Sequence, residues 1–135
     1  PIDFVKDAKS FNDELINARL KHFENGNNIN KEHVFYDRGL PDVIAYMNYF
    51  GQSPEPRYAD LCSKNRYDEV LILPPWKEIY VQDNERMENF EQACGIHAQL
   101  ENTYIQLGYK PVEVPFGTIE NRLQFVIDHI NGASE

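Results

Sequence analysis

Apolar residues recur at helical spacing in several segments of the chain. Between Asp3 and Asn25 they return every three or four residues, which predicts an amphipathic helix that Gly26, Asn27 and Asn28 end. A short helix can form between Tyr58 and Lys64. Longer helices are predicted from about Pro41 to Gly51, from Asp83 to Gly108 and from Thr118 to Gly132. The last of these would bury Ile119, Leu123, Val126, Ile127 and Ile130.

Three short apolar runs lie between the helices and predict buried strands. These runs are His33–Asp37, Val70–Leu73 and Pro111–Pro115. Because strands alternate with helices, we expect parallel pairing and an α/β layer fold. We find no repeat and no internal boundary, so residues 1–135 are expected to form a single domain.

The composition narrows the classes of partner and compartment. The 135 residues carry a formal net charge of −9 and no basic stripe, which argues against DNA or RNA as a partner. An acidic surface still allows a nucleotide, because one Mg²⁺ and a few basic groups can hold a triphosphate locally. No apolar run approaches the roughly 20 residues of a membrane span. The two cysteines, Cys62 and Cys94, are typical of a reducing compartment, so we expect a cytoplasmic protein.

The run Val34-Phe35-Tyr36-Asp37-Arg38-Gly39 places a carboxylate at the end of the first expected strand. Ligands of open parallel sheets bind at the carboxyl ends of strands. Asp37 could hold Mg²⁺ through water or accept a proton from an attacking hydroxyl. Arg38 could grip a phosphate or carboxylate with its fork of donors. The alternative is that Asp37 caps the next helix and pairs with Arg38.

A second motif joins Leu73-Pro74-Pro75-Trp76-Lys77 to Asp83-Asn84-Glu85-Arg86. Lys77 and Arg86 are candidates for lid cations, since positive charge offsets the charge that develops in phosphoryl transfer. Taken alone, the motif has a simpler explanation. In this simpler explanation, Arg86 forms an ion pair at the start of the helix and Trp76 packs as a hydrophobic side chain.

A third motif, Val114-Pro115-Phe116-Gly117-Thr118, follows the last expected strand. A glycine-containing turn into a helix offers backbone groups to a ligand. Taken alone, ordinary strand–turn–helix chemistry is the simpler explanation.

Together, the three motifs resemble those of small P-loop kinases. Val34–Gly39 looks like the Asp-Arg box of thymidylate kinases and related nucleoside kinases. Pro75-Trp76 with Asp83 and Arg86 looks like the lid of nicotinamide riboside kinases. The run from Phe35 to Arg122 is similar to bacterial P-loop proteins described as AAA-domain ATPases or predicted kinases.

This resemblance implies a three-layer, P-loop kinase-like parallel sheet flanked by helices, and a protein that binds ATP and Mg²⁺. Asp37 would take the metal or base role, Arg38 would face the acceptor and Arg86 would be the lid arginine. The cofactor-binding residues would be Lys77, Pro115, Phe116, Gly117 and Thr118, the last four beside the adenine.

One departure from the pattern affects both activity and fold. The Gly-x-x-x-x-Gly-Lys-Ser/Thr loop that cradles the phosphates does not occur in the 135 residues. We therefore expect the loop to lie upstream of Pro1, and these residues alone to have no appreciable ATPase or kinase activity. The sheet would be incomplete at its N-terminal strand. The strands ending at Asp37 and Leu73 would then pair directly, or another chain would fill the gap.

The leading hypothesis is a nucleoside-like small-molecule kinase with an unidentified acceptor. A regulatory ATPase without a phosphorylated product and a non-catalytic α/β interaction domain remain open, and a homo-oligomer is compatible with the sequence. Cys94 and His97 have a helical spacing that could hold a metal. A buried, hydrogen-bonded His97 is the simpler interpretation, because a structural metal usually needs four ligands.

Overall fold

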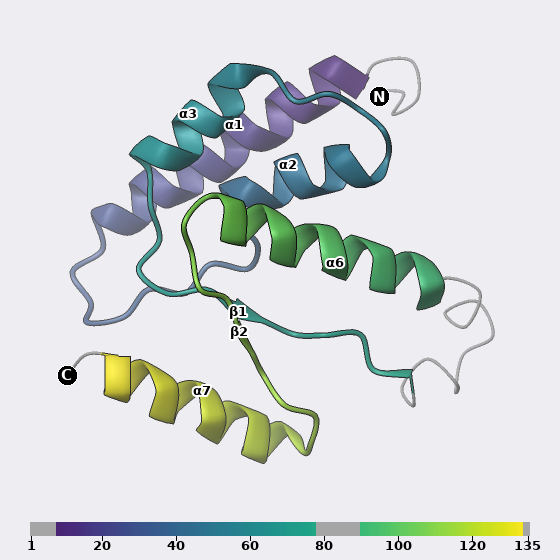
Figure 1. Ribbon diagram of the computed structural model, residues 1–135. Helices are drawn as coiled ribbons and strands as arrows, with labels where there is room; N and C mark the ends of the chain where they lie inside the picture. Colours follow the sequence, from purple (N-terminus) through teal and green to yellow (C-terminus); the bar gives the residue numbers. More distant parts are fainter. Residues whose placement is uncertain (1–7, 78–89, 134–135) are drawn as a thin grey trace. The chain divides into compact units, whose positions relative to one another are not determined.

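The computed structural model describes residues 8–77 and 90–133 and divides the chain into two compact units, Pro1–Arg66 and Tyr67–Glu135 (Figure 1). The first unit is helical, and the second contains both helices and strands. Asp83 and Arg86 lie outside the described residues, so the expected cap and the expected lid arginine have no described position. Within the described ranges, no helix is both long and apolar enough to cross a membrane.

The first unit consists of α1 (Ala8–Asn27), α2 (Leu40–Tyr49) and α3 (Pro56–Lys64), which confirms the helices predicted there. The central element is α2, which packs against both α1 and α3. A helix that is apolar on nearly every side is stable only when it is surrounded. The core accordingly includes Ile16 and Phe23 of α1, Leu40, Val43, Ala45 and Met47 of α2, and Tyr58 and Cys62 of α3.

The second unit consists of β1 (Leu71–Ile72), α6 (Phe90–Gln106), β2 (Val112–Glu113) and α7 (Ile119–Ala133). The two strands pair in parallel, with Leu71 opposite Val112 and Ile72 opposite Glu113. The carboxyl ends of β1 and β2 therefore lie at one edge of this small sheet. Gly108, at a φ of 92°, ends α6 in the left-handed conformation that glycine adopts without steric cost.

The prediction of a first strand at His33–Asp37 is wrong. Residues 33–36 form neither helix nor strand, and the sheet in the described part of the chain has two strands only. The predicted pairing of the segment ending at Asp37 with the strand ending at Leu73 is therefore not found there. The apolar run packs in another way, because Tyr36 stacks on Phe23 at a centroid distance of 6.0 Å while Phe35 is 68% exposed. The described sheet is a minimal parallel ladder of two strands and does not confirm the expected three-layer arrangement.

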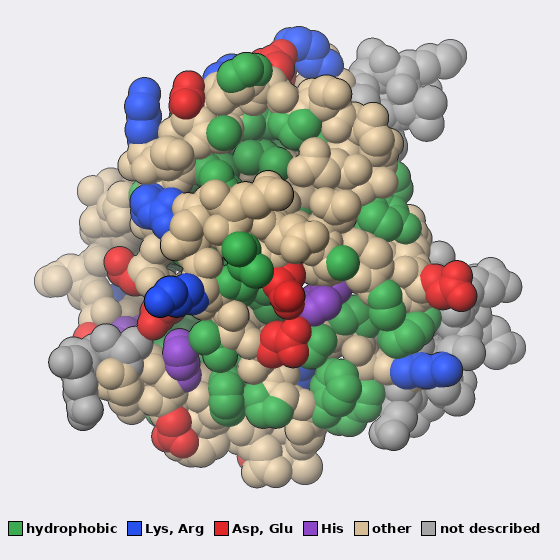
Figure 2. All heavy atoms as spheres, in the orientation of Figure 1, with side chains coloured by type: hydrophobic (Ala, Val, Ile, Leu, Met, Phe, Trp, Pro, Cys, Tyr) green, Lys and Arg blue, Asp and Glu red, His purple; other side chains and the backbone are tan. Residues whose placement is uncertain are grey.

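The prediction for the buried face of α7 is also wrong in part. Ile119, Leu123 and Ile127 are exposed, while Val126 and Ile130 are half-buried. Figure 2 shows hydrophobic side chains at the surface in the region of α7. A ladder of two residues per strand is too small to cover the whole apolar stripe of a 15-residue helix. In addition, Gly132 does not end the helix but lies inside its last turn.

Candidate functional site

The segment that carries Asp37 and Arg38 is fixed to the end of α1 by Tyr36. The Tyr36 hydroxyl donates to the carbonyl oxygen of Phe23 at 3.4 Å. The same ring approaches Gly26 so closely that a β-carbon there would overlap it. Glycine at position 26 is thus needed for packing, and the tyrosine fixes the approach of the chain to α2.

Arg38 has an unusual backbone conformation. It is the one non-glycine residue among residues 8–77 and 90–133 with a positive φ, 72°. A side chain in this region costs roughly 1–2 kcal/mol through its contact with the neighbouring carbonyl. Strain of this kind collects at functional positions. The guanidinium group lies over the ring of Tyr46, 5.7 Å from the centroid.

The start of α2 is held by polar contacts on both sides of Gly39. The backbone N–H of Gly39 donates to Asp42 Oδ1 at 3.3 Å. Arg19, on α1, donates from Nη1 to the Gly39 carbonyl oxygen at 3.1 Å. A guanidinium group from one helix thus fixes the first turn of the next. The alternative role considered for Asp37, capping this helix, is filled by Asp42.

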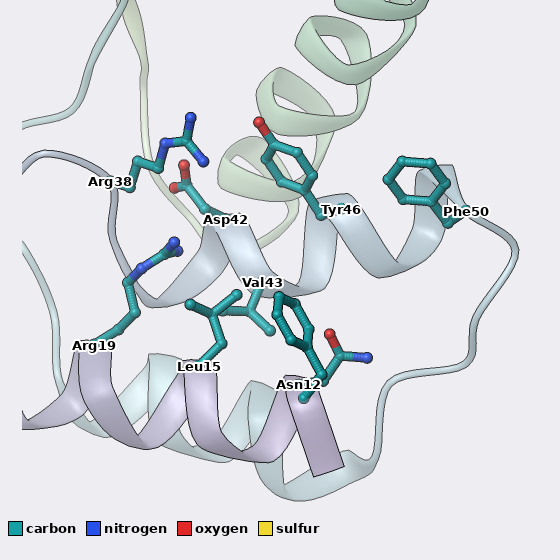
Figure 3. Close-up of a pocket in the computed structure, with 9 residues that line it drawn as sticks. Asn12, Leu15, Arg19, Arg38, Asp42, Val43, Tyr46 and Phe50 are labelled. Carbon is teal, nitrogen blue, oxygen red and sulfur yellow. The ribbon is translucent and has the colours of Figure 1, made fainter. Parts of the chain in front are cut away.

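A cavity of about 190 Å³ lies between α1 and α2. Figure 3 shows Arg19, Arg38 and Asp42 at one end of it and Phe50 at the other. The remaining lining includes Phe11, Asn12 and Leu15 of α1 and Val43 and Tyr46 of α2. We call this cavity the arginine pocket. Two guanidinium groups against one carboxylate give its polar end a net positive charge in a chain of net charge −9, so this end suits a small anionic group.

Asp37 is exposed and precedes Arg38 in the sequence, but it does not line the arginine pocket. Within the described residues it belongs to no cluster of three or more potential metal ligands. Its assignment as metal ligand or base therefore stays a prediction.

The second and third motifs meet at the carboxyl edge of the sheet in the second unit. The rings of Trp76 and Phe116 stack with centroids 4.8 Å apart and planes 16° apart. The Arg122 guanidinium lies 5.8 Å from the centroid of the Trp76 ring, and its Nε donates to the carbonyl oxygen of Pro115 at 3.1 Å. Aromatic pairs with centroids 4.5–7 Å apart attract one another, and arginine over a tryptophan face adds to this. We call these three side chains the strand-end stack.

The turn after Phe116 begins α7. Gly117 has a φ of 156°, and the Thr118 hydroxyl accepts a hydrogen bond from the backbone N–H of Asn121 at 3.1 Å. This confirms Thr118 as the cap of the last helix. Phe116 is 51% exposed, so half of its surface remains open to a ligand. The other predicted cofactor-binding residue of this unit, Lys77, is exposed.

The model of the AAA domain family matches residues 2–122. The chain belongs to this family. An AAA domain implies a nucleotide-binding function of the P-loop NTPase type, and such domains generally bind ATP and Mg²⁺. Comparison with curated proteins and with solved structures gave no match.

The described residues of this AAA-domain chain fit some parts of Mg²⁺-ATP and not others. The strand-end stack offers an aromatic surface, which suits a nucleotide base. Asp37 fits one position of a Mg²⁺ site, since this ion is usually held by one or two carboxylates together with phosphate oxygens. The phosphates themselves have no glycine-rich cradle in the 135 residues. The strand-end stack therefore offers a surface for a base, whereas the 135 residues contain no glycine-rich loop for the phosphates.

Sequence reasoning did not single out two residues of these sites, Arg19 and Arg122. Arg19 lies one helical turn after Leu15 on the apolar stripe of α1, and a cation in such a stripe is a usable signal. Arg122 lies one turn after Thr118 in α7, the helix that follows the third motif. Each arginine donates to a backbone carbonyl oxygen, Arg19 to that of Gly39 and Arg122 to that of Pro115, and the sequence does not reveal such partners.

Proposed function

We propose that this AAA-domain protein is a small-molecule kinase that transfers the γ-phosphoryl group of ATP to an acceptor with an anionic group. The observation that carries the proposal is the arginine pocket, in which Arg38 directly follows Asp37 in the sequence. A phosphoryl-transfer enzyme must hold its acceptor in a fixed orientation, and bidentate arginine contacts do this.

In this proposal the residues of the first unit bind the acceptor and act on its hydroxyl group. Arg19 and Arg38 bind the anionic group of the acceptor, and the strained backbone of Arg38 supports a functional role for it. The aromatic end of the pocket at Phe50 accommodates an apolar part of the molecule. Asp37 accepts the proton of the attacking hydroxyl, or holds Mg²⁺. The acceptor oxygen forms a bond to the γ-phosphorus as the bond to the β-phosphate oxygen breaks and ADP leaves.

The strand-end stack is proposed to bind the adenine. Pro115, Phe116, Gly117 and Thr118 would lie beside the base, as the resemblance implies. Lys77 and Arg86 would offset phosphate charge. Because the sequence contains no phosphate-binding loop, we propose that the 135 residues alone transfer no phosphoryl group.

Product analysis tests the proposed reaction. Protein from the complete reading frame is incubated with Mg²⁺-ATP and a panel of hydroxyl compounds with carboxylate or phosphate groups. A kinase yields ADP and a phosphorylated acceptor, and Asp37→Asn abolishes this product without loss of helix content. Release of ADP and free phosphate alone would establish the alternative, a regulatory ATPase. If calorimetry at millimolar Mg²⁺-ATP detects no nucleotide, a non-catalytic domain is the better assignment.

Binding of the base can be tested separately, because Trp76 is the single tryptophan of the chain. Adenosine should change the Trp76 fluorescence in a saturable way, and Phe116→Ala should weaken this binding. Loss of one base–aromatic contact costs about 1–3 kcal/mol, or roughly 5- to 150-fold in affinity. Phe35→Ala, at an exposed phenylalanine of the other unit, is the matched control. A fluorescence response that is the same in Phe116→Ala would remove the strand-end stack from the proposal.

A further inference from the structure

A histidine and two glutamates converge in the second unit. His97 Nε2 lies 3.5 Å from Glu113 Oε1 and 3.8 Å from Glu101 Oε2. The three potential ligand atoms all lie within 4.8 Å of one another. Among the described residues, this is the group of three histidine, cysteine or acidic side chains close enough to hold one metal ion.

The fold places these side chains together for simple reasons. His97 and Glu101 are one turn apart on α6, so they share a face of the helix. The buried Val114 follows directly after β2 and its N–H donates to the Ile72 carbonyl oxygen, so the preceding Glu113 points to the opposite face. The register that pairs Glu113 with Ile72 fixes the position of Glu113 along the pair of strands. One ligand position thus comes from a strand and two come from a helix.

The distances are those of ion pairs, and they also suit ligands of a shared ion. Both exceed the 2.7–3.2 Å of an N–H···O hydrogen bond, so the imidazole makes a close bond to neither carboxylate. Metal–ligand bonds of 2.0–2.2 Å in a tetrahedral site place neighbouring ligand atoms about 3.4 Å apart. The observed separations of 3.5 and 3.8 Å are near this value. Two carboxylates against one imidazole also leave excess negative charge, even when the imidazole is protonated, and a divalent cation would offset it.

We propose that His97, Glu101 and Glu113 bind a divalent transition-metal ion of the zinc type. A nitrogen ligand beside two carboxylates suits Zn²⁺, whereas Mg²⁺ prefers oxygen ligands alone. The imidazole side chain is 18% exposed and the carboxylates are 41% and 55% exposed, so the ion can enter from the carboxylate side. The metal ties α6 to β2. It is independent of the Mg²⁺ of the proposed kinase reaction.

Calorimetric titration of metal-free protein with Zn²⁺ tests the site. One ion per chain is expected to bind at a site that His97→Gln and Glu113→Gln each weaken by about 100-fold. This estimate follows because loss even of a group that only supports a ligand costs about 10–100-fold. Glu120→Gln, at an exposed glutamate of α7, should leave the affinity unchanged. Cys94→Ser should also leave it unchanged, although Cys94 is exposed and only one turn before His97 on the same helix.

Circular dichroism confirms that each variant keeps its helix content. Glu113→Gln, at a half-exposed side chain, remains informative if His97→Gln does not fold. Co²⁺ in place of Zn²⁺ should give the visible absorption of a four- or five-coordinate site, and Glu113→Gln should remove it. Zinc affinity that is equal in wild type and Glu113→Gln, or lost in Cys94→Ser, would overturn the proposal.

Discussion

The phenol ring of Tyr36 occupies the space that a β-carbon on Gly26 would fill. Gly26→Ala should therefore lower the free energy of unfolding, although alanine is favoured over glycine in a helix by about 1 kcal/mol. Overpacking typically costs about 1–3 kcal/mol, so a net loss of up to about 2 kcal/mol is expected. Urea unfolding of the single and double variants measures this. In the Tyr36→Ala background the same Gly26→Ala change should be neutral or stabilising, and a loss that persists there would contradict the packing argument.

Arg38 offers a comparison between backbone strain and function. Arg38→Gly and Arg38→Ala both remove the guanidinium group, but only glycine adopts a φ of 72° without steric cost. The glycine variant should be more stable than the alanine variant by about 1 kcal/mol. Both should lose affinity for an anionic ligand of the arginine pocket, whereas Lys21→Gln, at an exposed lysine of α1, should not. Equal stability of the two variants in urea would show that the positive φ carries no strain.

Sequence reasoning was most accurate where the signals are local. Pro41 in the first turn of α2 and the Thr118 hydroxyl at the start of α7 act on residues within three or four positions, so both helices were predicted. It was wrong for Val34-Phe35-Tyr36, because an apolar run does not say what it packs against. Tyr36 contacts Phe23 and Gly26, and the sequence marked Gly26 only as the end of a helix.

The candidate sites show the same division. Trp76 and Phe116 were each predicted to follow a strand of a parallel sheet, and the parallel pairing of β1 with β2 agrees with this. That these two strands are direct neighbours was not predicted. The arginine pocket could not be predicted, because it exists only once α1 and α2 have packed together. Glu113 was likewise absent from the sequence interpretation of His97, since the two residues meet only through the register of β2.

Asp13 makes the stability of the first unit dependent on pH. Its carboxylate accepts hydrogen bonds from the Tyr58 hydroxyl, from Arg57 and from Lys9. The Tyr58 bond is the main cause that lowers the pKa of Asp13 below its ordinary 3.8. Because the folded pKa is the lower one, the stabilisation is complete above the unfolded value and is lost as the pH falls through the folded value.

Tyr58→Phe should therefore cost most at neutral pH. A hydrogen bond to a charged group contributes about 1.5–3 kcal/mol, so a loss of that order is expected at pH 7. The difference between variant and wild type should shrink below pH 3.8, where unfolded Asp13 is protonated. Tyr49→Phe is the control, since Tyr49 makes a ring contact with Phe50 and its hydroxyl has no hydrogen bond within the described residues. A difference that is constant from pH 7 to pH 3 in thermal unfolding would argue against the charged bond.

The two cysteine thiols should react with a disulfide reagent at very different rates. The rate at Cys62, the slower one, can report ligand binding in the arginine pocket. Burial raises the pKa of the Cys62 thiol to about 11, whereas Cys94 is exposed. At pH 8 only about one Cys62 in a thousand would be a thiolate, and reagent must also reach a core position. In Cys94→Ser protein, a disulfide reagent should therefore modify Cys62 only as fast as the first unit opens. An anionic ligand held by Arg19 and Arg38 stabilises the closed form and should slow that modification in proportion to its occupancy. If the ligand still slows the modification of Cys62 in Arg38→Gln, the ligand binds elsewhere. Rapid modification without ligand would show that Cys62 is not buried.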